Sequence, residues 1–177
     1  MSGRSEEFEA ALRFVLRWET VYRNGAAVAT NDPDDPGGLT KFGIDQRSNP
    51  GVDIANLTED QAANLYWKEW LDCKADQLKW PLSLAHFDAA VNTGPTQAAR
   101  FLQRAVGAVP DGVVGPKTIE AAKAANAQSA ALAMCVEREK FYVHLAESKP
   151  QFRKFLRGWM RRVDDLRGRI YDLGAHV

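Results

Sequence analysis

The sequence predicts a mainly α fold interrupted by one short irregular or β-hairpin loop after the first helix. Helix-capping patterns and apolar residues at helical spacing recur along most of the chain. Prolines and glycines, by contrast, gather in one stretch, NDPDDPGG, which favours turns. At 177 residues the chain is long enough to bury a core as one domain, or as one domain with an attached subdomain.

The first helix is expected to begin after Ser5, a residue type that caps helix N-termini, and to run to about Tyr22. Asn24-Gly25 is a natural stop for that helix, because both residue types adopt the left-handed conformation that ends helices. A short hairpin is expected around Thr40 to Ile44.

The remaining helices follow similar signals. Thr58-Glu-Asp-Gln61 is a capping box that opens a helix through about Leu71. Further helices are expected at about 84–91, from Pro95 onward, and at about 117–126, 128–147 and 151–173. The sequence pattern changes near Asn92, and we expect two lobes there, residues 1–94 and 95–177. No flexible linker separates them, so they are expected to pack against each other.

Composition narrows the classes of function. No apolar run approaches a membrane span, and the start MSGRSEEFEA lacks the apolar core of a signal peptide. We therefore expect synthesis in a bacterial cytoplasm and no stable membrane insertion. Cys73 and Cys135 lack metal-ligand spacing and are expected to be single buried thiols, and the histidines are scattered. No metal and no cofactor are expected.

Charge is uneven along a chain of zero net charge. Residues 32–60 carry seven acidic and two basic side chains, whereas residues 137–172 carry ten basic and six acidic ones. The basic end suits an anionic polymer such as a bacterial wall or a nucleic acid, although a solvated helix face with paired charges explains most of it. The balanced total and the acidic loop argue against nucleic acid as a partner.

Glu19 is the leading candidate for chemistry. It continues the apolar stripe of Phe8, Leu12 and Val15 on one helical face, which is expected to shield it from water and raise its pKa. A carboxylic acid that stays protonated near neutral pH is the proton donor that glycosidic-bond cleavage requires. The alternative is a helix-end glutamate that simply reaches water.

The loop after Glu19 offers candidates for the second role in such a reaction. Asp32 and Asp35, with Asp34 between them, supply solvated carboxylates, and the Thr40 hydroxyl can hold a water molecule. The alternative for each aspartate is turn formation, because Asp before Pro or Gly hydrogen-bonds its own backbone.

Candidate substrate-binding residues lie on both sides of this loop. Tyr22, Tyr66 and Trp67 offer aromatic faces on which sugar rings pack, although Tyr66 is also typical of a helix core position. Asp88 and Asn92 share a helix face and can hydrogen-bond an acetamido group, while Asn92 before Thr93-Gly94 is equally typical of a helix end.

Several segments taken in order resemble glycoside hydrolase family 108, the phage- and prophage-type N-acetylmuramidases. These segments are the helix ending in Glu19, NDPDDPGGLTKFGI, LYWKEW and HFDAAVNTGP. The stretch FLQRAVGAVPDGVVGPKT, continued by FLRGWMRR, is similar to the predicted peptidoglycan-binding region that accompanies this family. The resemblance covers about residues 8–162.

The resemblance implies a lysozyme-like fold, with a catalytic lobe at 1–94 and a helical peptidoglycan-binding region at 95–177. It implies a muramidase that cleaves the β-1,4 bond between N-acetylmuramic acid and N-acetylglucosamine, with Glu19 as the acid. It also implies a monomeric phage endolysin whose partner is peptidoglycan and which needs a holin or another export route to reach the periplasmic wall.

The sequence departs from the family pattern at one place. Family members usually carry Glu-Gly-Gly-Tyr at the end of the catalytic helix, whereas this chain reads Glu-Thr-Val-Tyr, with extra residues before the loop. Glycines at this place can provide a positive φ or close approach to the sugar. The competing hypothesis is therefore a catalytically impaired muramidase fold that binds peptidoglycan as a scaffold.

Overall fold

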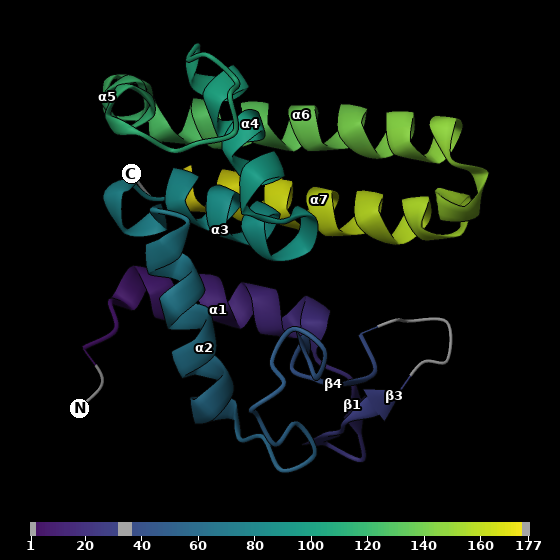
Figure 1. Ribbon diagram of the computed structural model, residues 1–177. Coiled ribbons are helices and arrows are strands. Elements are labelled where there is room, and N and C mark those ends of the chain that lie inside the picture. The colour runs from purple at the N-terminus through teal and green to yellow at the C-terminus, as the bar shows by residue number, and fades with distance from the viewer. Residues whose placement is uncertain (1–2, 32–36, 175–177) are drawn as a thin grey trace. The chain divides into compact units, whose positions relative to one another are not determined.

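The computed structural model describes residues 3–31 and 37–174, which form two compact units, Met1–Glu69 and Trp70–Val177. Seven α-helices, two short 3₁₀ helices and five short strands make up this described part (Figure 1). The expected mainly α fold, with hairpins after the first helix, is confirmed. Within the described residues, no helix combines the length and apolar content needed to cross a bilayer.

The first unit begins with helix α1 (Glu6–Glu19), followed by five strands and most of helix α2 (Glu59–Asp72). Ser5 caps α1 as expected, its hydroxyl accepting the Phe8 N–H at 3.2 Å. The capping box at α2 is also confirmed, since Gln61 N–H donates to Thr58 Oγ1 at 3.3 Å and Thr58 N–H to Gln61 Oε1 at 2.9 Å.

The end of α1 differs from the expectation. The helix stops at Glu19, and Thr20 is already extended. Asn24-Gly25 does not end the helix but forms the turn of a hairpin between β1 (Tyr22–Arg23) and β2 (Ala26–Ala27). Asn24 and Gly25 both have positive φ, 51° and 78°. Two successive positive-φ residues match the twist of a two-residue hairpin, which is why Asn-Gly favours such turns as well as helix ends.

A second set of strands follows β1 and β2. Strand β3 (Thr30–Asn31) pairs with β4 (Leu39–Lys41), and β4 pairs with β5 (Ile44–Asp45), all antiparallel. The β4–β5 pair is the hairpin expected around residues 40 to 44, and that expectation is confirmed. These short strands lie beside the C-terminal end of α1 (Figure 1).

The second unit is a helical bundle. Its elements are the 3₁₀ helices η1 (Ala75–Gln77) and η2 (Pro150–Phe152) and the helices α3 (Leu82–Thr93), α4 (Pro95–Val106), α5 (Pro116–Ala124), α6 (Ala127–Ser148) and α7 (Arg153–Gly174). The two long helices, α6 and α7, run side by side (Figure 1). Gln128 near the start of α6 donates to the Ile170 carbonyl near the end of α7, so the pair is antiparallel.

The core of the second unit contains charge as well as apolar side chains. Asp88 of α3 lies between Arg138 of α6 and Arg162 of α7, and all three are buried. Cys73 and Cys135 are buried, as expected, and burial raises the pKa of the Cys135 thiol to about 11. The second unit is therefore tied together by ion pairs that cross three helices.

Candidate active site

Glu19 occupies the last position of α1 and lines an open cavity of about 420 Å³ in the first unit. Phe8, Leu12 and Val15 of the same helix are buried, so the expected apolar stripe is present, and Glu19 at its end is half-buried. Seven residues line the cavity: Glu19, Gly37, Thr40, Gly43, Asp45, Arg47 and Ser48. The helix thus delivers one carboxyl group to a hollow whose other walls come from the loop and hairpin after it.

Gly43 lies directly against the Glu19 side chain. A Cβ atom added to Gly43 would lie 2.7 Å from Cβ and 3.0 Å from Cγ of Glu19, and 2.6 Å from the hydroxyl of Tyr66. Gly43 also has a φ of +76°, a conformation that other residues rarely adopt. Position 43 therefore requires glycine for two reasons: the positive φ of the turn and the close approach of the backbone to the Glu19 side chain.

The Phe42-Gly43 turn is anchored from the side of α2. Phe42 also has a positive φ, 55°, and its carbonyl accepts a hydrogen bond from the buried Tyr66 hydroxyl at 2.8 Å. Such a bond satisfies a polar group that burial would otherwise leave unpaired. Tyr66 is 2% exposed, so in this conformation it holds the turn in place beneath Glu19 and presents no open face to a sugar.

The β4–β5 register places Thr40 and Asp45 opposite each other on neighbouring strands. Side chains of directly opposed residues project from the same face of a sheet, and both residues line the cavity with Glu19. The Thr40 hydroxyl donates to the Gly38 carbonyl at 3.2 Å, and Asp45 Oδ1 accepts the Ser48 N–H at 2.8 Å. Both side chains are therefore held by local hydrogen bonds at the cavity wall.

Asp45 is the site residue that the sequence interpretation missed. The sequence motifs point to a second carboxylate among the aspartates before Thr40, whereas Asp45 follows the turn. The signal was present in TKFGID, because a two-residue turn at Phe42-Gly43 makes Thr40 and Asp45 cross-strand partners. Together with Glu19, Asp45 gives the cavity the two carboxyl groups that glycosidic-bond cleavage requires.

The other sequence-predicted catalytic residues, Asp32 and Asp35, lie outside the described residues, as does Asp34. Tyr22 is on strand β1 and 54% exposed, so its ring is open to a ligand. Trp67 packs edge-on against Phe8, with ring centroids 5.0 Å apart, and thereby contributes to the packing of α1 on α2.

The departure from the family pattern after Glu19 is compatible with the backbone. Thr20 has a φ of −99° and a ψ of 128°, ordinary extended values, and Val21 is not among the positive-φ residues. The Val21 carbonyl accepts the Val28 N–H at 3.0 Å, which continues the β1–β2 hairpin. Neither position requires glycine, so the Thr20-Val21 pair introduces no backbone strain next to Glu19.

Asp88 and Asn92 belong to the second unit, where both are engaged within the protein. Asp88 is fully buried, with one oxygen 2.7 Å from Arg138 Nη1 and the other 2.7 Å from Arg162 Nη2. The Asn92 side-chain oxygen accepts the hydroxyl of Tyr142. Asp88 is therefore a structural residue in this conformation, and we leave it out of the proposed substrate-binding residues.

The electrostatics of the second unit agree with that role. Burial by itself would raise the pKa of Asp88, but the guanidinium groups of Arg162 and Arg138 outweigh it and hold the pKa below its usual value. Nearby on α3, burial lowers the pKa of His86 to about 4, so the ring is neutral at pH 7, with Nε2 2.9 Å from the Cys73 carbonyl. Within the described part of the chain, no group of three His, Cys, Asp or Glu side chains has the arrangement of a metal site.

Comparison with known families identifies two segments. Residues 12–94 match the model of the glycosyl hydrolase 108 family, and residues 97–164 match that of a family described as a predicted peptidoglycan domain. The resemblance inferred from the sequence motifs is thereby confirmed. None of the curated proteins compared with this chain matches it.

A solved structure has a similar fold over nearly the whole chain. SagA from Brucella abortus is similar to this chain with a TM-score of 0.76 and 27% sequence identity. The match covers 93% of this chain and 94% of that one, so it includes both family segments. The lysozyme-like, mainly α fold implied by the motifs is confirmed.

Proposed function

We propose that this chain, whose residues 12–94 match the glycosyl hydrolase 108 family, is an N-acetylmuramidase that uses Glu19 as its general acid. The matches to that family and to a predicted peptidoglycan domain support a glycoside hydrolase that acts on peptidoglycan of the cell wall. The bond that we propose it cleaves is the β-1,4 bond between N-acetylmuramic acid and N-acetylglucosamine.

One observation carries the assignment of the acid. Glu19 lines a cavity together with a second carboxylate, Asp45, and a hydroxyl, Thr40, while glycine backbone at Gly43 packs against its side chain. A half-buried carboxyl group at the edge of an open hollow can reach a bound glycosidic oxygen, and the second carboxylate can act on a water molecule. These are the two functions that hydrolysis of a glycoside requires.

The proposed chemistry assigns each group a step. Glu19 donates its proton to the oxygen of the leaving sugar as the glycosidic bond breaks. The Thr40 hydroxyl and an aspartate hold the water molecule, and the aspartate takes its proton as the water attacks the anomeric carbon from the opposite face, so the configuration is inverted. Asp45 is the described aspartate that lines this cavity, and Asp32 and Asp35 of the preceding loop are the other two candidates.

Substrate contacts extend from this cavity. Tyr22, exposed on β1, is proposed to pack against a sugar ring, because aromatic faces stack on the apolar faces of sugars. Arg47 brings a cation to the same cavity, where it can pair with a carboxylate substituent of the glycan. Residues 1–94 are proposed as the catalytic lobe and residues 95–177 as the wall-binding region.

Substitution of Glu19 tests the assignment. We expect Glu19→Gln to lower the release of reducing sugar from purified peptidoglycan by roughly 1000-fold, in the range typical of losing a general acid. Glu7→Gln, which changes an exposed glutamate of the same helix, is the matched control and should retain wild-type activity. Wild-type turnover by Glu19→Gln would refute the assignment of Glu19 as the general acid. If the wild-type chain bound peptidoglycan without releasing sugar, the scaffold alternative would be favoured.

The second carboxylate is identified by comparing three substitutions. Asp45→Asn, Asp32→Asn and Asp35→Asn each remove one candidate with little change in size. We expect Asp45→Asn to lower turnover by about 100-fold, within the range for general base catalysis, and more than either of the others. The anomeric configuration of the first product, read by NMR, should be inverted; a retained configuration would instead make the second carboxylate a nucleophile.

The biological role that we propose is host lysis by a phage or prophage endolysin. Its support is the likeness of the motifs to phage-type muramidases. Expression in a bacterium with and without a holin tests this role, because lysis should require the holin. Lysis of equal rate without the holin would show that another export route delivers the enzyme.

A further inference from the structure

A second cavity, of about 580 Å³, lies in the unit Trp70–Val177. Its volume falls in the range of small-molecule sites. The residues that line it are Lys74, Gln77, Val114, Gly115, Pro116, Ile119, Glu120 and Lys123. They come from the segment around η1, from the loop before α5 and from α5 itself. The family segments at 12–94 and 97–164 therefore both contribute to this cavity.

The loop that forms one wall is fixed by a buried side chain. Gln103 of α4 is 1% exposed, and its amide nitrogen donates to Asp111 Oδ1 at 2.6 Å and to the Val113 carbonyl at 2.9 Å. Its amide oxygen accepts the Gly112 N–H at 2.9 Å. A loop held at several points by one buried amide keeps its shape, so Val114 and Gly115 are presented to the cavity in a preformed arrangement.

The opposite walls are also tied to each other. Lys79 follows η1 and donates from Nζ to the Lys123 carbonyl near the end of α5 at 3.1 Å. Lys74 precedes η1 in a left-handed conformation, with a φ of 66°, which turns the chain at the edge of the cavity. The cavity is therefore part of a structure braced on both sides, and a ligand would meet walls already in place.

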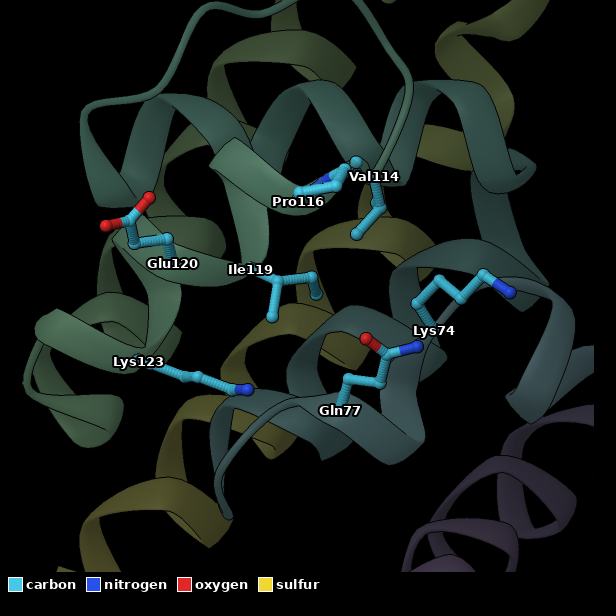
Figure 2. A pocket seen from close by; sticks show the side chains of 8 residues that line it. Lys74, Gln77, Val114, Pro116, Ile119, Glu120 and Lys123 are labelled. Atoms are coloured by element: carbon cyan, nitrogen blue, oxygen red, sulfur yellow. The ribbon is translucent and has the colours of Figure 1, made fainter.

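The lining combines apolar side chains, a side-chain amide and charged groups of both signs. Figure 2 shows Val114, Pro116 and Ile119 grouped at the centre, with the amide of Gln77 facing Ile119. Lys74 and Glu120 lie at opposite sides, and Lys123 extends along the lower edge toward Gln77. An apolar centre flanked by separated positive and negative groups suits a ligand with small aliphatic side chains and both charges.

The charges of the lining favour a peptide as the ligand. None of the eight lining residues is aromatic, so the lining itself offers no ring on which a sugar could stack. A short peptide with carboxylates, an amino group and alanine-type methyl groups has complementary chemistry, because ammonium groups pair with carboxylates and the amide of Gln77 can bond peptide backbone.

We propose that this cavity binds the peptide stems of peptidoglycan, with Lys74 and Lys123 pairing with stem carboxylates and Glu120 with a stem amino group. This inference rests on peptidoglycan as the substrate and adds that a cavity to which both family segments contribute recognises peptide rather than glycan. The enzyme would thereby be held on the wall by stems while Glu19 acts on the glycan strand.

The test measures binding separately from hydrolysis. The full chain carrying Glu19→Gln is mixed with purified sacculi, either intact or stripped of their stems by an amidase, and the bound fraction is measured by pelleting. We expect stem removal to weaken binding about tenfold or more, since several charge-assisted hydrogen bonds are lost. The soluble stem peptide L-Ala-D-Glu-diaminopimelate-D-Ala should shift NMR signals of the lining residues.

Two variants locate the effect in this cavity. Lys74→Ala combined with Lys123→Ala removes the cations, and Gly115→Leu fills the hollow; Gly115 has an ordinary φ of −101°, and no atom lies within 4 Å of an added Cβ. Both should weaken binding to intact sacculi about tenfold. Lys117→Ala, an exposed lysine of the same helix outside the lining, is the matched control and should bind as the parent chain does.

The outcomes separate this inference from the proposed function. Equal binding to intact and stripped sacculi, or unchanged binding by both cavity variants, would overturn the stem-binding site. Such a result would leave hydrolysis untouched, because release of sugar by the chain with its native Glu19 is measured independently on the same sacculi. Loss of binding in the Lys117→Ala control would also overturn it, by showing that general positive charge is responsible.

Discussion

Glu19 in the first unit and Asp88 in the second are both carboxylates on helices, and their surroundings are opposite. Glu19 is half-buried, lines an open cavity and has the backbone of Gly43 against its side chain. Asp88 is fully buried, and guanidinium groups of two helices occupy its two oxygens. One carboxylate is placed where a ligand can reach it, and the other is enclosed by its partners.

The contrast shows how the two units divide their tasks. The first unit builds its site from strands of two or three residues and tight turns, which allow backbone to approach a side chain closely. The second unit fixes long helices through buried ion pairs. If this division is right, changes near Asp88 alter stability, and changes near Glu19 alter activity.

The largest effect on stability is expected at Asp88. Asp88→Asn removes the carboxylate that the buried guanidinium groups of Arg138 and Arg162 share, and breaking a buried ion pair in this way costs about 3–5 kcal/mol of unfolding free energy. Asp164→Asn is the matched control, since this exposed carboxylate on α7 pairs with Arg167 and its loss should cost at most about 1 kcal/mol. Denaturant titration measures both, and equal small losses would refute the structural role of Asp88.

A somewhat smaller effect is expected from pH, through His86. The pKa of His86 is lowered to about 4 in the folded chain because the ring is buried, against 6.5 when exposed. Between these values the unfolded chain binds more protons, so the unfolding free energy falls as the pH drops from about 6.5 to about 4, by about 3 kcal/mol in total. His86→Gln should flatten this dependence, whereas His144→Gln, an exposed residue of α6, should preserve it.

Denaturant titrations at several pH values between 4 and 7 check the His86 prediction. Acid destabilisation in this window that persists unchanged in His86→Gln would contradict it. Asp88 affects stability at lower pH than His86 does. Its pKa in the folded chain lies below the usual value, so its contribution to the unfolding free energy is lost only as the pH falls further.

The smallest effect on stability, with a marked effect on activity, is expected at Gly43. Gly43→Ala forces a positive φ on alanine, which costs about 1–3 kcal/mol, and it pushes a methyl group into Glu19 and Tyr66. Gly25→Ala has nearly the same φ, +78°, but open space at the added carbon. Gly43→Ala should lose more stability than Gly25→Ala, because only Gly43→Ala adds a clash to the backbone strain, and only Gly43→Ala should lose activity, by about 100-fold as the acid is displaced. Equal activity of the two variants would show that Gly43 does not position Glu19.

The sequence allowed most of the fold to be predicted. The capping box at Thr58 and the Pro95 start are local signals, so the helices they mark could be read directly. Asn24-Gly25 was misread because positive φ at two residues suits a helix end and a hairpin turn alike, and only pairing with a partner strand distinguishes them.

The candidate site was predictable only in part, and for a similar reason. Glu19 and Thr40 stand in a recognisable motif, whereas Asp45 enters the site through strand register. Asp88 looked like a ligand-binding residue because the arginines that enclose it lie 50 and 74 positions away along the chain. Long-range partners of this kind leave no local trace in a sequence.

The most direct test of the central claim is the mass of the fragments released from peptidoglycan. Wild-type enzyme should release fragments whose new reducing end is N-acetylmuramic acid, and the Glu19→Gln variant, folded and as stable as wild type, should release essentially none. Fragments ending in N-acetylglucosamine, or muramic acid ends released by Glu19→Gln at the wild-type rate, would contradict the account.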